Sequence, residues 1–189
     1  AMLAELLQRA TSMKVQQVTQ GMPISANQVY VIPPNTELRL HNGALNLVKP
    51  KEPRGRRLPV NILFQSLADN LRTAAVGVIL SGMGSDGTLG AQAIKTAGGL
   101  IAVQQPDSAQ FNSMPQSAIA SGCADIIANA ADLPAQILLS VTYKSLITAQ
   151  LVTEQAQQAP ASASPERWPV RRALRSWILQ RACRRAPRG

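Results

Sequence analysis

The chain has 189 residues, of which 46% are apolar and only 3% are aromatic. That length allows one domain and little more, with a core built mainly from aliphatic side chains. The net charge of +9 is unevenly placed, because residues 160–189 hold eight arginines and one glutamate, whereas residues 1–159 hold eleven basic and nine acidic residues. Residues 1–159 are therefore close to neutral, which argues against a nucleic-acid partner.

The two cysteines, Cys123 and Cys183, lie outside any CxxC motif or ligand cluster. This placement predicts a reduced, cytoplasmic chain with no metal site. We also expect no cofactor. No uncharged apolar run reaches the roughly 18 residues that a membrane span needs, and the N-terminus lacks the basic lead-in of a signal peptide. The first residues instead have the pattern of a helix interior, so we expect the natural sequence to extend upstream of Ala1.

Hydrophobic periodicity predicts helices and strands in alternation over the first part of the chain. In chain order, the expected elements are a helix at 2–10, strands at 15–18 and 29–32, a hairpin of 37–40 with 45–48, a helix at 61–71, a strand at 75–80, a helix at 88–96, a strand at 100–104, a short helix at 114–120, a strand at 124–127 and a helix at 133–141. Apolar and polar residues alternate on both sides of Asn42-Gly43, which favours a tight turn there. The strands at 75–80 and 100–104 are continuously apolar, as strands buried in a parallel sheet are. The pattern predicts an α/β, doubly wound, Rossmann-like fold with a mostly parallel sheet and an antiparallel hairpin.

The composition changes towards the C-terminus, and we divide the chain into a domain at 1–145 and a linker with a basic tail at 146–189. From Gln155 onward, Gln, Ala, Ser and Pro predominate, which predicts a linker. If residues 168–182 are helical, Trp168 and Trp177 share an apolar face surrounded by arginines. A basic amphipathic helix can lie on a membrane or bind an acidic partner, and an unstructured tail without an evolved role is the alternative.

The glycine-rich stretch 81–90 follows a predicted buried strand and precedes a predicted helix, where ligands bind in open α/β sheets. Three interpretations compete on spacing. Gly82, Gly84 and Gly87 match G-x-G-x-x-G, with Asp107 further on, but this dinucleotide pattern is weak and Asp86 would place a negative charge in the turn. A nucleophile elbow at Ser85 fails because Met83 replaces the first glycine of G-x-S-x-G. The interpretation of Ser85 as a nucleophile also lacks a base, since the only histidine, His41, lies at the predicted hairpin turn.

The third interpretation makes Asp86 the residue that carries chemistry. A carboxylate in such a turn can accept the Nδ1–H of a histidine, fix its tautomer and stabilise its protonated form. A structural alternative is that Asp86 caps the helix that begins near Thr88. Spacing alone favours the structural alternative.

Several motifs together resemble the catalytic domain of the chemotaxis protein-glutamate methylesterases. They are Gly-Met-Gly-Ser-Asp-Gly at 82–87 after Val-Gly-Val-Ile-Leu-Ser, Tyr-Val-Ile-Pro-Pro at 30–34, Arg-Leu-Pro-Val at 57–60 with Leu-Phe-Gln-Ser-Leu-Ala at 63–68, Ala-Gly-Gly at 97–99 with Gln104, and Met-Pro-Gln-Ser-Ala-Ile at 114–119. The resemblance covers roughly residues 1–145 and is greatest to methylesterase domains fused to a methyltransferase. It implies a Ser-His-Asp hydrolase that removes methyl groups from glutamate γ-methyl esters on the cytoplasmic helices of chemoreceptors. Asp86 takes the place of the triad aspartate, and Met83 is a candidate backbone donor to the oxyanion.

The chain also departs from this family. The family's serine and histidine belong to turns after the first two strands, and both precede the helix that opens this chain. The resemblance therefore implies a catalytic domain that is incomplete at its N-terminus, with exposed sheet edges and apolar faces. Without a nucleophile or a base, we expect this chain alone to be inactive. A non-catalytic interaction module is the alternative function, ahead of a dinucleotide-binding fragment.

Overall fold

A computed structural model of the chain describes residues 2–53 and 55–158, and the expectations for the basic tail at 160–189 lie outside these residues. The chain divides into two compact units, residues 1–141 and residues 142–189. Within the described part, no helix is both long enough and apolar enough to cross a membrane. The boundary at 145 stays a prediction.

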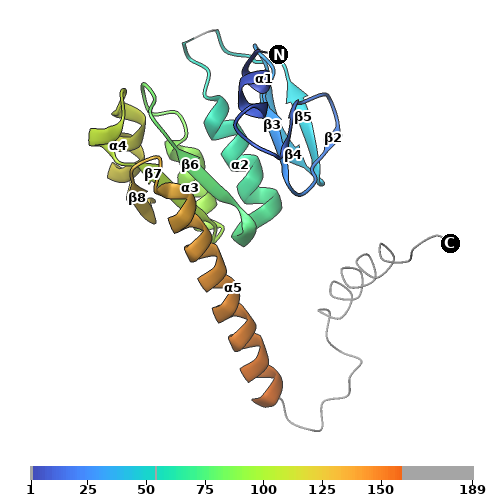
Figure 1. Cartoon of the computed structure of the whole chain (residues 1–189), viewed down its shortest axis with the longest axis vertical. Helices are drawn as coiled ribbons and strands as arrows, with labels where there is room; N and C mark the ends of the chain where they lie inside the picture. The colour runs from blue at the N-terminus through green and yellow to red at the C-terminus, as the bar shows by residue number, and fades with distance from the viewer. Residues whose placement is uncertain (1, 54, 159–189) are drawn as a thin grey trace, which may run out of the picture. The chain divides into compact units, whose positions relative to one another are not determined.

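The first unit is a mixed α/β structure in which the predicted alternation of helices and strands is confirmed (Figure 1). Its elements are α1 (Met2–Gln8), β1 (Lys14–Gln17), β2 (Met22–Pro23), β3 (Gln28–Val31), β4 (Glu37–His41), β5 (Ala44–Val48), α2 (Pro59–Leu71), a 3-10 turn η1 (Arg72–Ala74), β6 (Val76–Ile79), α3 (Thr88–Thr96), β7 (Leu100–Gln104), a 3-10 turn η2 (Pro106–Ser108), α4 (Ser113–Ala120), β8 (Ile126–Ala128) and the start of α5 (Leu133–Gln158).

A three-stranded parallel sheet forms the centre of this unit, in the order β6-β7-β8. β7 is buried at all of its positions, because helices cover both of its faces. On one face, Ile101 and Val103 pack in a cluster with side chains of α2, α3 and α4. On the other face, Leu100 and Ala102 pack against Leu133 at the start of α5. The predicted parallel pairing of the strands at 75–80 and 100–104, between layers of helices, is confirmed.

The predicted hairpin is also confirmed. β4 pairs with β5 in antiparallel register, with Leu40 opposite Leu45. The two turn residues, Asn42 and Gly43, have φ angles of 50° and 75°, as a type I′ turn requires. This turn suits the right-handed twist of the strands it joins, which explains why the sequence Asn-Gly is a reliable signal.

The parallel strands do not form one sheet, however. β1 pairs in parallel with β3 in a separate two-stranded sheet, while β2, β5 and β4 form the antiparallel sheet. Among the described residues, no strand joins β3 to β6. The prediction of a mostly parallel sheet therefore holds for β6-β7-β8, and the first parallel pair stands apart because nothing bridges the two edges.

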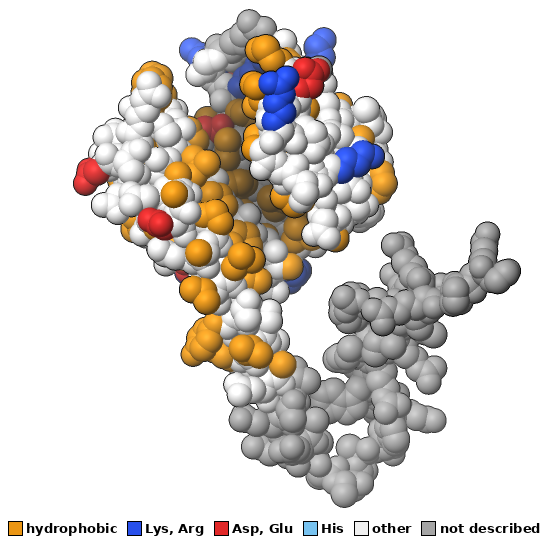
Figure 2. Space-filling model, in the orientation of Figure 1, with side chains coloured by type: hydrophobic (Ala, Val, Ile, Leu, Met, Phe, Trp, Pro, Cys, Tyr) orange, Lys and Arg blue, Asp and Glu red, His pale blue; other side chains and the backbone are white. Residues whose placement is uncertain are grey.

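One face of β6 is covered and the other is largely open. Gly77 and Ile79 are buried against the cluster formed with α2 and α3, whereas Val78 on the opposite face is 39% exposed and Leu80 just beyond the strand is 47% exposed. Figure 2 shows hydrophobic side chains gathered in the middle of the visible face, over the region where Figure 1 draws β6. β6 is thus an edge strand whose second apolar face is covered at Val76, which packs against the Leu100 and Leu133 cluster, and open from Val78 onward, as expected for an incomplete sheet.

α5 corrects two predictions. The sequence pattern predicts a helix end at Val141 and a linker from Gln155, but α5 continues from Leu133 to Gln158. The physical reason is that Gln, Ala, Leu and Glu are all good helix formers and that neither Gly nor Pro occurs between residues 135 and 159. A change of composition towards Gln and Ala therefore does not mark the end of regular structure.

Candidate functional site at the carboxyl end of β6

The glycine-rich residues 81–87, here called the acid loop, follow β6 and lead into α3. Three backbone groups of the acid loop are held by the segment that follows β7. The N–H of Gly82 donates to the carbonyl of Phe111 at 2.9 Å, the N–H of Met114 donates to the carbonyl of Gly82 at 3.1 Å, and the N–H of Gly84 donates to Oγ of Ser113 at 2.9 Å. Residues 111–114 therefore fix the conformation of the acid loop at Gly82 and Gly84.

The buried side chain of Gln104 fixes the start of the acid loop. Its Oε1 accepts a hydrogen bond from the N–H of Ser81 at 2.9 Å, and its amide nitrogen donates to the carbonyl of Ser108 at 3.0 Å. Gln104 is only 7% exposed, so both hydrogen bonds are needed to offset the desolvation of its amide. The hydroxyl of Ser81 in turn accepts the N–H of Phe111 at 2.9 Å.

Asp86 binds the N-terminus of α2 rather than that of its own helix. Its Oδ2 accepts the N–H of Val60 at 3.1 Å, and its Oδ1 accepts the N–H of Asn61 at 2.9 Å. The residue before α2 is Leu58, whose side chain cannot accept a hydrogen bond, so these first-turn donors need a partner from elsewhere. The expectation that Asp86 caps the helix beginning near Thr88 is wrong, since the N-cap of α3 is Gly87 and no side chain caps it there.

The two helices cap each other across the acid loop. Asp86 lies just before α3 and caps α2, while Oδ1 of Asn61 in α2 accepts the N–H of Gly90 in α3 at 2.9 Å. Helix N-termini carry partial positive charge, so both ends favour the oxygens that they bind. The carboxylate plane of Asp86 is fixed by two donors, and about two of its roughly four lone-pair positions stay open to a further donor.

Two of the three glycines of the G-x-G-x-x-G pattern argue against a dinucleotide site. A Cβ on Gly82 would lie 2.3 Å from Sδ of Met114, and a Cβ on Gly87 would lie 2.9 Å from a side-chain carbon of Val60. The space freed by these two glycines is therefore filled by the chain's own side chains and not open to a pyrophosphate. Only at Gly84, where φ is +84°, is the space open.

Met83 is the other candidate residue. Its side chain is 74% exposed at the tip of the acid loop. Its backbone N–H has no hydrogen-bond partner among the residues that the structure describes. That N–H is available to an oxyanion, in keeping with the role that the family resemblance implies, although the role itself stays a prediction.

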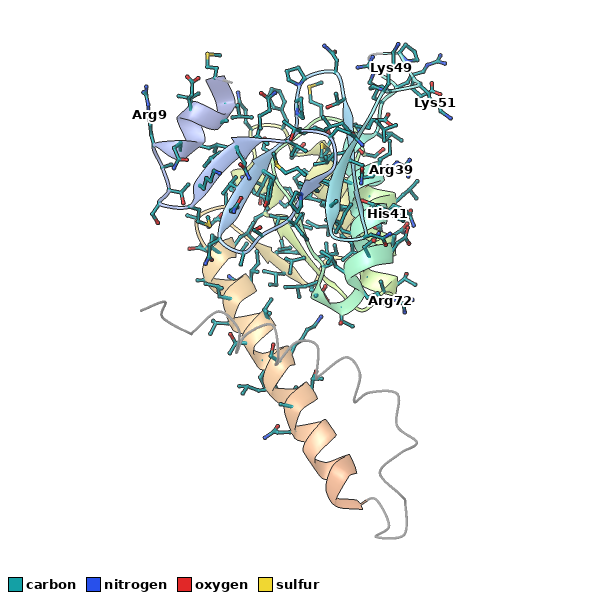
Figure 3. The ribbon with its side chains drawn as sticks, turned by 90° about the vertical axis from the view of Figure 1, so that its right-hand side faces the viewer. Arg9, Arg39, His41, Lys49, Lys51 and Arg72 are labelled. Atoms are coloured by element: carbon teal, nitrogen blue, oxygen red, sulfur yellow. The ribbon has the colours of Figure 1, made fainter. Side chains whose placement is uncertain are left out.

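His41 lies far from Asp86. The N–H of Asn42, beside it, donates to Oδ1 of Asn70 near the C-terminal end of α2, whereas Asp86 binds Asn61 near the N-terminal end. Nine residues of helix separate these two points, a rise of about 13 Å. Figure 3 shows His41 at the outer side of the hairpin, between Arg39 and Arg72. The pairing of His41 with Asp86 as base and acid is therefore excluded in this structure.

We expect replacement of Asp86 by alanine to lower the free energy of unfolding by about 2 kcal/mol, because two donors at the start of α2 lose a charged acceptor. Urea denaturation followed by circular dichroism measures this change. The matched control is Asp107→Ala, which removes an exposed carboxylate with no hydrogen bond among the described residues and should change the stability by less than about 0.5 kcal/mol. Equal effects of the two substitutions would show that the Asp86 contacts contribute nothing to folding.

Comparison with known proteins identifies relatives of this arrangement. The family model described as CheB methylesterase matches residues 1–137. The protein-glutamate methylesterase/protein-glutamine glutaminase of Bordetella pertussis is 36% identical over 140 residues, which cover 71% of this chain and 40% of that protein. An uncharacterized 104.1 kDa protein of Rhodobacter capsulatus is 44% identical over 123 residues, which cover 65% of this chain but only 13% of that protein.

A solved structure agrees with these sequence matches. The methylesterase catalytic domain of Thermotoga maritima CheB superposes with a TM-score of 0.64 at 27% identity, and the match covers 71% of this chain and 74% of that domain. About a quarter of the solved domain therefore has no counterpart here. The chain spans well under half the length of the two curated relatives described above.

Proposed function

Because the chain belongs to the CheB methylesterase family, we propose that it supplies the acid-bearing part of a protein-glutamate methylesterase catalytic domain. The reaction proposed for the complete domain is hydrolysis of glutamate γ-methyl esters on chemoreceptors, which releases methanol. The observation that carries the proposal is the Asp86 carboxylate, held by two backbone donors at the carboxyl end of β6. Ligands of open α/β sheets bind at this end of the strands.

Asp86 has the role of orienting a base in this proposal. Its unused lone pairs accept the Nδ1–H of a histidine supplied from outside these 189 residues, which leaves Nε2 of that histidine free to take a proton from the nucleophile. The carboxylate then stabilises the protonated imidazole as the ester carbonyl is attacked. The N–H of Met83 would donate to the developing oxyanion, since it has no partner within the described chain.

The chain alone lacks the groups that attack the ester. A carboxylate orients a base but does not itself replace an activated serine, and the one histidine of the sequence is His41, at the far end of α2. The open edge and open face of β6 support the proposal, because an intact catalytic sheet would cover them.

We expect no methanol release when the purified 189-residue chain is incubated with methylated chemoreceptor. Gas chromatography of the headspace measures the methanol, and a complete methylesterase of the same family is the positive control. Methanol release by the parent chain that disappears in the Asp86→Ala variant would contradict this expectation. It would show that the chain contains its own nucleophile and is catalytic by itself.

The partners in this proposal are the methylated cytoplasmic helices of chemoreceptors and a methyltransferase domain, fused or separate. The cytoplasm is the proposed location, and fractionation of cells that express the chain tests it.

The second candidate function is a non-catalytic interaction module, which the exposed side chains of Val78 and Leu80 favour. A domain completed with the missing serine and histidine segments could bind the receptor and yet release no methanol. That result would support the second candidate function.

A further inference from the structure

A short basic loop joins β5 to α2. The residues at 49–57, here called the 49–57 loop, have the sequence Lys-Pro-Lys-Glu-Pro-Arg-Gly-Arg-Arg, with five basic residues and one acidic residue. The remainder of residues 1–159 holds six basic and eight acidic residues. The loop therefore carries a charge of +4 on a body that is otherwise slightly negative, so its charge is local and not a property of the whole surface.

The described cations of the 49–57 loop have no anionic partner within the described part of the chain. Lys49, Lys51 and Arg56 are exposed, and the first two point outward at the edge of the molecule in Figure 3. None of these cations takes part in the ion pair between Lys95 and Asp125, which lies far along the sequence. Arg57 donates from Nε to the backbone carbonyl of Glu52 at 2.8 Å, which leaves its charge without an anionic partner in residues 2–53 and 55–158.

The 49–57 loop is constrained rather than open-ended. The N–H of Arg56 donates to the carbonyl of Pro53 at 3.1 Å and closes a turn, in which Gly55 adopts a φ of +91°. Pro50 and Pro53 limit the backbone further. A constrained backbone presents Lys51 and Arg56 with a smaller entropy cost on binding than a flexible segment would.

The loop leads directly to the site. Arg57 is three residues before Val60, whose N–H binds Asp86, so the backbones of these two residues are at most about 10 Å apart. Arg57 also lines an open cavity of about 490 Å³ together with Pro59 at the start of α2 and Ile32 just beyond β3. A ligand that contacts Arg57 would therefore lie near the first turn of α2, whose backbone N–H groups hold Asp86.

We propose that the 49–57 loop docks an acidic polypeptide segment and so positions the substrate next to Asp86; this inference rests on the proposed function. Hydrolysis of each glutamyl ester creates a carboxylate, so a segment with several such sites becomes more anionic as the reaction proceeds. Arginine guanidinium groups bind carboxylates in a bidentate manner, and lysines add attraction at longer range. The loop contains no aromatic side chain for stacking on bases and no apolar anchor for a bilayer, which favours a polypeptide over a nucleic acid or a membrane.

The test uses the full 189-residue chain and a fluorescent peptide rich in glutamate and free of basic residues, with anisotropy as the readout at low salt. Lys51→Glu with Arg56→Glu should weaken binding at least tenfold, roughly, because a like charge replaces an attraction. The matched control is Arg9→Glu with Lys14→Glu, which changes the net charge equally at exposed positions near α1 and in β1 and should change the affinity less than about threefold. Circular dichroism confirms that both variants fold.

Several outcomes would overturn the inference. The first is an absence of binding by the parent chain, and the second is equal affinity of the loop variant and the parent, which would assign any binding to another part of the chain. Equal binding of a peptide with glutamine in place of every glutamate would remove the electrostatic basis. Tighter loop-dependent binding of phosphatidylserine vesicles or of a single-stranded oligonucleotide would assign the loop to a membrane or to nucleic acid. The binding assay does not depend on turnover. If the proposed hydrolysis fails, the binding result therefore still tests the role of the 49–57 loop.

Discussion

Replacement of Gly90 by valine should lower the free energy of unfolding by at least about 3 kcal/mol. Gly90 lies where α3 crosses α2, and a Cβ at this position would stand 2.5 Å from Cβ of Phe64 and 3.0 Å from both Cα and the carbonyl oxygen of Asn61. Two of these three atoms belong to the backbone, so no side-chain rotation relieves the overlap. The helices must separate, and separation also breaks the hydrogen bond from the N–H of Gly90 to Asn61.

The separation of α2 from α3 should reach the candidate site as well. Asn61 holds Asp86 through its N–H, so a shift of α2 moves the carboxylate away from its present position. Gln92→Val is the matched control, because it places the same β-branched side chain on the exposed face of α3 and should cost only about 0.5 kcal/mol. Thermal or urea unfolding measures both variants. A Gly90→Val protein as stable as the control would contradict the close crossing of α2 and α3.

Local sequence signals predict the elements whose structure is decided locally. Asn42-Gly43 specifies the hairpin because few other dipeptides adopt two positive φ angles. The continuous apolar run before the acid loop specifies a strand of a parallel sheet, although one face of that strand is largely open here. The division of the parallel strands into two sheets depends on which strand pairs with which edge. Pairing between distant segments leaves no periodicity in the sequence, so the separate β1–β3 sheet does not follow from the pattern.

The candidate site is predicted in part. The sequence identifies the acid loop and Asp86, but it assigns the partner of Asp86 to the wrong helix. The sequence does contain a signal for the correct helix. Pro59 marks the first turn of α2, and Leu58 before it cannot cap that helix. A helix start without a capping side chain needs an acceptor from elsewhere in the chain. Sequence reasoning misses Ser113 altogether, because its contact with the acid loop joins residues that are 29 positions apart.

The largest expected effect belongs to the proposed triad role of Asp86, and a chimera with a complete domain tests it. In a chimera, residues 1–137 of this chain replace the matching part of the Thermotoga maritima catalytic domain, which supplies the quarter of the domain that has no counterpart here. We expect the chimera to release methanol from methylated receptor. Asp86→Asn should lower kcat roughly 10³- to 10⁴-fold, because asparagine cannot hold the required histidine tautomer or stabilise the imidazolium.

Two controls separate chemistry from folding in this experiment. Asp107→Asn makes the same substitution at an exposed carboxylate and should leave kcat within about twofold of the parent chimera. The domain of Bordetella pertussis, whose protein is 36% identical to this chain, offers a second host if the first chimera does not fold. Circular dichroism and unfolding curves of the Asp86→Asn chimera show whether the loss of its contacts with α2 has also disturbed the fold.

The rate of methanol release by the folded chimera, compared with the rate of its folded Asp86→Asn variant, therefore tests the central claim most directly. An active chimera whose Asp86→Asn variant is folded but slower by about a thousandfold or more is the predicted result. A folded Asp86→Asn chimera that keeps its activity within about tenfold of the parent would contradict the assignment of Asp86 as the acid of a methylesterase triad.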